Sequence, residues 1–450
     1  MMSKIPFTPR RVVSWLSVCL LGAALPLHAQ TPSTPDDAAL SVALTAASER
    51  ELRSSEKSLT LNELIDIVLA HNTELLAAQQ ARTGALAGIR SASAYVNPRV
   101  DWQSGRNQAR LPGTAAGNMQ GWSIAQLIEN PSARSARIDG AEAGARSAEQ
   151  VIAITRNAVV SETKLRASEY QLRRAEAAMG AENLALLQQV RDRVQLRVSS
   201  GEAARYELIK ADAEIVNARE RLQTARLHAE QVLVALNRLA AGKLPARWTL
   251  AGSLDEKNPT LPVLDEVQQR AVDSNPELRA LQAEVERAEA RLRGARASVL
   301  PGVEVRVGQT TEPEVRQSHV GLNIQVPLFD RREGVIAEAS SELERLRGRL
   351  DGRRAELREQ VRLARQSLEI ATLRVQALDE GVVKNAEAAL RVAQAAYQFG
   401  ERGILDVLDA QRVLRAARAD LLQARYQVQA ARIELDTLTG RFSVPPQTQP

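Results

Sequence analysis

The sequence has 450 residues, of which 44% are hydrophobic and 3% aromatic, and its formal net charge is +5 at pH 7. Lys4, Arg10 and Arg11 precede an N-terminal apolar stretch, and elsewhere basic and acidic residues are interspersed as on solvated helix faces. This pattern excludes a basic, aromatic-rich surface for nucleic acid.

The N-terminus has the features of a secretory signal peptide. The apolar stretch over 12–27 is followed by Ala29, a small residue that signal peptidase accepts. Because this stretch is shorter than the roughly 20 residues of a membrane-spanning helix, we predict a cleaved signal over 1–29, then a disordered or extended lead over 30–57. The only cysteine, Cys19, lies inside the apolar stretch, where Val18 before it favours an ordinary signal residue over a lipid acceptor.

The rest of the chain contains two copies of one pattern, over 58–241 and 263–440. A Gly- and Pro-rich linker over 242–262 joins them, and a tail over 441–450 follows. The corresponding landmarks of the two copies are Asn72 and Asn275, Pro98 and Pro301, Gly201 and Gly400, and Glu207 and Asp406.

Within each copy, a helical period gives way to a strand period and then returns. We predict β-hairpins over about 96–128 and about 302–328, because apolar residues such as Val303, Val305 and Val307 alternate there with polar ones. No apolar run of helical length follows the signal, so a membrane-spanning part has to use strands. Four strands cannot close a barrel, which needs about eight, so either several chains pool their strands or the sheet stays open.

Long helices flank the predicted hairpins. No proline occurs over 133–198 or 331–399, and at about 1.5 Å per residue each run can extend close to 100 Å. The last helix has an apolar seam with the 3-4 spacing of a coiled coil: Leu414, Ala417, Leu421, Ala424, Val428, Ala431, Leu435 and Leu438.

Four motifs in this order resemble the TolC family of outer-membrane efflux channels over about 59–440. They are Asn275-Pro276-Glu277-Leu278, Leu300-Pro301, Val326-Pro327-Leu328-Phe329-Asp330 and the run from Gly403 to Gln411. The resemblance implies an α+β fold: a long antiparallel α-helical coiled-coil barrel plus four transmembrane β-strands per chain. In a homotrimer these strands pool to a 12-stranded β-barrel, set in outer-membrane lipid with a periplasmic extension.

The resemblance also implies a function and partners. The chain is expected to be the passive outer-membrane channel of a tripartite efflux system, docked to a periplasmic adaptor (membrane fusion protein) and an inner-membrane pump of the resistance-nodulation-division class. Ser123 to Glu129, with Arg134, Ala136 and Arg137, resembles the heavy-metal (CzcC-like) branch, although Pro131-Ser132-Ala133 replaces that branch's usual residues. Divalent heavy-metal cations are therefore one candidate solute, and multidrug or type I protein export is the alternative.

The resemblance assigns a periplasmic gate to the turn between the long helices. Its residues are Tyr397, Arg402, Asp406, Asp409 and, in the first copy, Glu207, which is a candidate ion-pair partner of Arg402. Asp406 and Asp409 share a helical face and in a trimer form rings of carboxylates, although acids also suit an ordinary helix start. The adaptor-docking tips are expected at the paired turns, which contain Ser200, Gly201, Glu202, Gly400, Glu401 and Gly403.

Other chemistry finds no support in the sequence. His71, His228 and His319 lie in different segments without a neighbouring His or Cys, and no nucleophile or phosphate-loop motif occurs, so we expect neither an enzyme, nor a cofactor, nor a metal site. Trp102 and Trp122 border the first strand pair and are candidates for a membrane-interface belt. The long helices alone also fit a periplasmic coiled-coil scaffold or adaptor, but the apolar strand faces favour a channel.

Overall fold

A computed structural model describes residues 57–444 except 109, 114 and 255–259. The predicted signal peptide, Cys19, the lead up to residue 56, part of the linker and the end of the tail lie outside the described residues. The elements of the first copy are β1 (Lys57–Leu59), α2 (Leu61–His71), α3 (Thr73–Ser93), β2 (Arg99–Asn107), β3 (Gly117–Ile128), α4 (Pro131–Ser199) and α5 (Arg205–Leu239).

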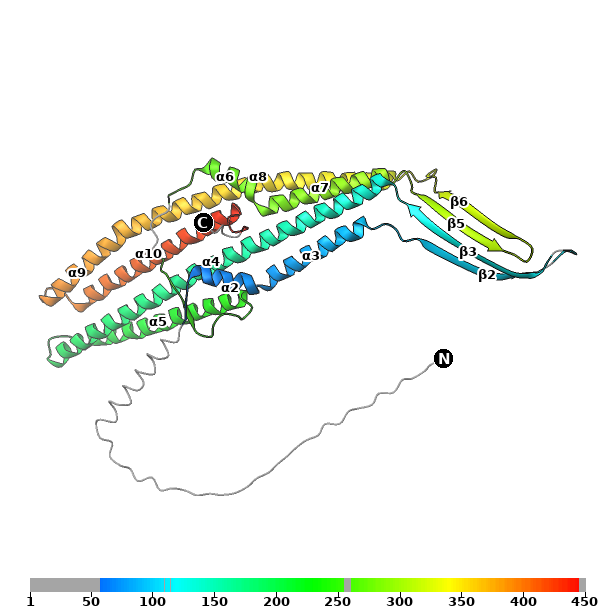
Figure 1. Cartoon of the computed structure of the whole chain (residues 1–450). Coiled ribbons are helices and arrows are strands. Elements are labelled where there is room, and N and C mark those ends of the chain that lie inside the picture. The colour runs from blue at the N-terminus through cyan, green and yellow to red at the C-terminus, as the bar shows by residue number, and fades with distance from the viewer. Residues whose placement is uncertain (1–56, 109, 114, 255–259, 445–450) are drawn as a thin grey trace, which may run out of the picture. The chain divides into compact units, whose positions relative to one another are not determined.

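The second copy repeats this order (Figure 1). Its elements are β4 (Trp248–Leu250), α6 (Leu264–Ser274), α7 (Pro276–Ala297), β5 (Val303–Thr311), β6 (Arg316–Ile324), α8 (Glu333–Ala377), the π-helix η1 (Leu378–Val383), α9 (Lys384–Gln398) and α10 (Ile404–Leu438). The first hairpin has the longer loop, 108–116 against 312–315, but the second copy has the longer connection from strand to helix, 325–332 against 129–130.

Two buried asparagines explain why the helices begin where they do. Asn72 accepts a hydrogen bond from the Leu75 N–H (3.0 Å) and so caps α3, while its amide donates to the Leu239 carbonyl at the end of α5 (3.1 Å). Asn275 caps α7 and donates to the Leu438 carbonyl at the end of α10 (3.0 Å) in the same way. Each asparagine thus satisfies the N-terminus of one helix and the C-terminus of another.

The helices and strands form a layer in which the first copy lies beside the second. α3 packs on α4, α4 on α7, and α7 on α8, and the four-stranded sheet has the matching order β2-β3-β5-β6 (Figure 1). All three strand pairs are antiparallel. The layer therefore has two unlike edges, one formed by α3 and β2 and the other by α8 and β6.

The sheet has one apolar and one polar face, as the alternation predicted. In register, Val100, Ile124, Val307 and Val320 lie in one row across all four strands. Arg99, Ala125, Arg306 and Gly321 form a row on the opposite face. The apolar row is exposed, because no described element covers it.

At the other end of the layer, α5 packs on α4, and α10 packs on α4, α8 and α9. The predicted seam of α10 is confirmed, since its positions from Leu414 to Leu435 are buried and belong to the largest apolar cluster, with Leu438 packed against them. The combination of long helices with four strands confirms the predicted fold class. None of the described helices is both long and apolar enough to cross a membrane.

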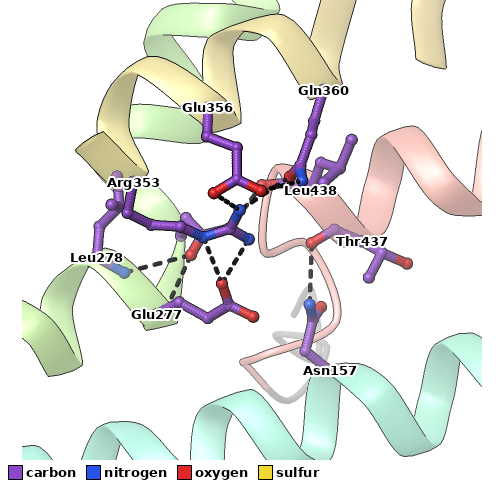
Figure 2. A network of polar contacts seen from close by, with 9 residues as sticks. Asn157, Glu277, Leu278, Arg353, Glu356, Gln360, Thr437 and Leu438 are labelled. Carbon is purple, nitrogen blue, oxygen red and sulfur yellow. Dashed lines mark hydrogen bonds and ion pairs between the residues drawn. The ribbon is translucent and has the colours of Figure 1, made fainter. Parts of the chain in front are cut away.

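Polar contacts gather where α7 begins and α10 ends, and one of them joins the two copies (Figure 2). Arg353 of α8 donates to the Glu277 carboxylate of α7 (2.6 Å) and lies 3.0 Å from Glu356. On the other side, Asn157 of α4 donates to the Thr437 carbonyl at the end of α10 (2.9 Å). These bonds fix the relative positions of four helices that lie far apart in the sequence.

Candidate functional site at the paired turns

The turns between the long helices have the same backbone geometry in both copies. Gly201 and Gly400 have φ values of +77° and +76°, which glycine adopts without steric cost. The N–H of Glu202 donates to the Arg197 carbonyl (2.8 Å), and the N–H of Glu401 donates to the Ala396 carbonyl (2.9 Å). Each long helix thus ends in a glycine-dependent cap, and the chain reverses within a few residues.

The two acidic landmarks occupy equivalent positions after these turns. Glu207 lies in the first turn of α5 and Asp406 in the first turn of α10. Neither helix has a side-chain cap on its first N–H groups, so both carboxylates lie near an uncapped, positive helix end.

An apolar cluster joins the two turns to each other. Val194 of α4 and Ile404 and Val407 of α10 are buried together, and Leu208 of α5 and Tyr397 of α9 pack against them. The predicted gate residues of the second copy and the tip of the first copy therefore form one structural unit within a single chain.

Tyr397 contacts a residue that the sequence did not point to. The Arg197 guanidinium, in the last turn of α4, lies 5.1 Å from the centre of the Tyr397 ring, a cation–π distance. The Tyr397 hydroxyl is buried and has no hydrogen-bond partner among the described residues. The only sequence signal for Arg197 was a basic residue at a helix C-terminus, which is common.

The arginines near the predicted acids lie on the same helix or turn. Arg402 is 3.9 Å from Asp406, and Arg412 pairs with Asp409. Among the described residues, no ion pair joins Arg402 to Glu207, and that pairing stays a prediction. Both aspartates are half exposed or more, which screens these pairs.

The two tryptophans lie on the apolar face of the sheet. Trp102 and Trp122 are direct cross-strand partners. They lie in one row across the sheet with Gln309 and Ser318. The next row, farther from the helices, contains the polar residues Ser104 and Gln120. The tryptophans therefore mark the boundary of the apolar band, as an interface belt requires.

The heavy-metal-branch motif turns out to be a clamp between the first hairpin and the helices. Arg137 makes two hydrogen bonds to the Glu129 carboxylate (2.6 and 2.9 Å) and also donates to the Ala92 carbonyl (2.9 Å) and the Ala94 carbonyl (3.2 Å). Arg134 donates to the Ser93 carbonyl (2.5 Å). The hydrogen bonds from Arg137 hold the pKa of Glu129 below its ordinary value of 4.5. Two arginines of α4 thus satisfy the last carbonyls of α3.

A metal site in the described part of the chain would need side chains that can bind the ion together. No group of three or more His, Cys, Asp or Glu side chains converges there. The imidazole of His71 instead contacts the Ile67 carbonyl of its own helix (3.0 Å).

Comparisons with known proteins agree with this architecture. The family model "Outer membrane efflux protein" matches residues 267–441. The chain is 28% identical to the cobalt-zinc-cadmium resistance protein CzcC of Cupriavidus metallidurans, over 86% of this chain and 92% of that protein. It is 26% identical to the outer membrane efflux protein BepC of Brucella suis, over 61% of each. The crystal structure of CusC superimposes with a TM-score of 0.73 at 20% identity, over 84% of this chain and 91% of that chain.

Proposed function

Because this chain belongs to the outer membrane efflux protein (TolC) family, we propose that three copies assemble into the exit duct of a tripartite efflux system. The chain is an outer-membrane efflux channel component with a periplasmic extension. A periplasmic adaptor and an inner-membrane pump complete the system. The energy for transport comes from the pump, and the channel conducts passively.

The observation that supports a ring is the pair of unlike edges of the layer. β2 and β6 each have one unpaired edge, and exposed sheet edges are a liability that closure removes. Exposed apolar side chains also occur on the long helices. On α5 they are Tyr206, Ile209, Val216 and Val234, and on α8 and α9 they are Leu363, Leu373 and Val392. Joining unlike edges of identical chains generates a ring when the rotation between neighbours closes.

Three chains of four strands give the even, sufficient strand number of a membrane barrel. Multi-angle light scattering in mild detergent should therefore report a mass of three chains. A monomer, with the protein still folded by circular dichroism, would contradict the assembly.

We infer that the paired turns form the gate of this duct. The cluster of Val194, Ile404 and Val407 supports this, because it couples the acid-bearing start of α10 to the tip of the first copy. The carboxylates of Asp406 and Asp409 attract cations at a constriction. The Arg197 to Tyr397 contact holds α9 against α4 inside each chain.

Single-channel recording in planar bilayers tests this assignment. Arg197→Ala and Arg402→Ala should raise conductance, because each removes a contact that holds a turn in place. Asp406→Ala and Asp409→Ala should reduce cation selectivity, and Asp420→Ala, an exposed acid farther along α10, is the matched control. Parental conductance and selectivity in all four gate variants would leave the acids as ordinary helix-start residues.

Divalent heavy-metal cations are the solute that we propose, supported by the similarity to CzcC over nearly the whole chain. Efflux of other solutes, as in a general efflux protein such as BepC, is the alternative. A strain that lacks its own channel can be complemented with this chain and its genomic neighbours. Growth in cobalt, zinc or cadmium should then be restored, whereas restored growth only with drugs would favour the alternative.

A further inference from the structure

A short apolar segment after β6 stands uncovered at one edge of the layer. Val326, Leu328 and Phe329 are all exposed, and the Phe329 side chain is 102% exposed. The backbone of the segment is nevertheless ordered by its own bonds. The Leu328 N–H donates to the Val326 carbonyl (3.0 Å), and the Arg332 N–H donates to the Asp330 carboxylate (2.8 Å). A contiguous exposed apolar group of this kind indicates a binding surface.

An open, groove-shaped cavity of about 660 Å³ lies where β3 passes into α4, beside Tyr95 in the connection between α3 and β2. Five lining residues are apolar or aromatic, namely Tyr95, Leu127, Ile128, Pro131 and Ile138, and five are polar or charged, namely Gln126, Glu129, Arg134, Ser135 and Asp139. Tyr95 is 72% exposed, and its ring is held by the Arg134 guanidinium, 4.3 Å from the ring centre. Arg134 and Arg137 also donate to the last carbonyls of α3, so the same side chains tie this cavity to the end of that helix.

The segment and the cavity lie at the same level of the layer. Ile128, which lines the cavity, pairs in register with Val303, and Val303 pairs with Ile324. Val326 follows Ile324 by two residues, just beyond the paired part of β6, and so lies near the level where β3 passes into α4.

We propose that Leu328 and Phe329 of one chain insert into the Tyr95 cavity of the next chain in the ring. The proposal rests on the ring-shaped assembly proposed above. When the β6 edge of one copy meets the β2 edge of the next, the uncovered segment faces the cavity because both lie at the same level. The contact forms a ring of aromatic anchors where the sheet meets the helices, and it locks the register between neighbouring chains.

The chain is well suited to a disulfide test, because Cys19 is its only cysteine and can be changed to alanine. Tyr95→Cys with Phe329→Cys should form covalent dimers and trimers on a non-reducing denaturing gel after mild oxidation. Tyr95→Cys with Leu300→Cys is the matched control, because Leu300 is exposed before β5, in the middle of the layer. The control pair and each single variant should stay monomeric on the gel.

Light scattering on the same samples separates this inference from the proposed function. A trimer without the 95–329 crosslink, or with as much crosslink in the control pair, overturns the contact and leaves the channel intact. A folded monomer overturns both. A fluorophore on Phe329→Cys gives a second measurement in vesicles that contain brominated phospholipid. Quenching would show that lipid covers Phe329 and would overturn the contact, whereas unchanged emission supports it.

Discussion

The two copies of the repeat agree at their helix ends and differ where the strands pass into the helices. The turns at Gly201 and Gly400 have φ values within one degree of each other, and Asn72 and Asn275 cap equivalent helices. In contrast, the first strand-to-helix connection is short and clamped by Glu129 and Arg137, while the second is longer and exposes Phe329. The geometry of a helix end depends on the few residues around it, so both copies have the same glycine turns and asparagine caps. Edges that bind unlike edges of another chain have to diverge.

The largest expected difference concerns two glycines that follow α5 and α10 at positions that do not correspond, since the residue of the first copy that matches Gly440 is Ala241 (φ +50°). Gly242 and Gly440 have φ values of +76° and +67°, but a Cβ on Gly440 would lie 2.8 Å from the Ser274 carbonyl oxygen, whereas Gly242 faces open space. Gly242→Ala should cost about 1 kcal/mol of unfolding free energy from the left-handed backbone alone. Gly440→Ala should cost about 3 kcal/mol or more, because the clash adds to that strain. Guanidinium unfolding followed by circular dichroism measures both, and equal costs would show that the contact with Ser274 adds nothing to the backbone strain.

The buried asparagines should show the opposite behaviour, an equal loss in both copies. Asn72→Ala and Asn275→Ala each remove a helix cap worth about 1 kcal/mol and leave a carbonyl unpaired at a further cost of about 1 kcal/mol. Asn72→Asp and Asn275→Asp keep the capping oxygen but cannot donate, so they should recover about half of the loss. A loss of stability in only one of the two variants would show that the two asparagines are not equivalent.

The clamp of the first connection should make stability depend on pH. Glu129 has a lowered pKa because Arg137 donates to it, so it stabilises the folded chain above its ordinary value of 4.5, and this contribution disappears as the pH falls through the lower folded pKa. Glu129→Gln should therefore lose about 1–2 kcal/mol at pH 7 and approach the parent in acid. The control Glu333→Gln lies in the first turn of α8, at the second connection, and should show no such convergence.

The smallest effect concerns the π-helix that only the second copy has. Gly381 lies within η1, and a Cβ there meets no atom within 4 Å, as at Gly348 in the regular part of α8. Gly348→Ala should stabilise the chain by about 0.5–1 kcal/mol, because alanine has the higher helix propensity. An equal gain from Gly381→Ala would show that an extra residue, and not glycine, makes the π turn. A loss would show that the turn requires glycine.

The sequence by itself determined the features that depend on neighbours along the chain. The proline-free runs, the seam from Leu414 to Leu435 and the alternation around Val305 all follow from local periods of helix and strand. The paired turns were also readable, because Gly201 and Gly400 adopt a backbone conformation that other residues disfavour. The predicted gate acids accordingly lie at the start of α5 and α10.

Only the tertiary structure decided which side chains meet across helices. The Arg197 to Tyr397 contact and the second bond of each capping asparagine could not be read from spacing. The family motif that contains Arg137 likewise did not indicate that this side chain binds the end of α3. The physical reason is that a period gives the face of one helix, whereas a contact depends on the rotation and axial offset of two helices. Packing over the whole length of the layer sets both.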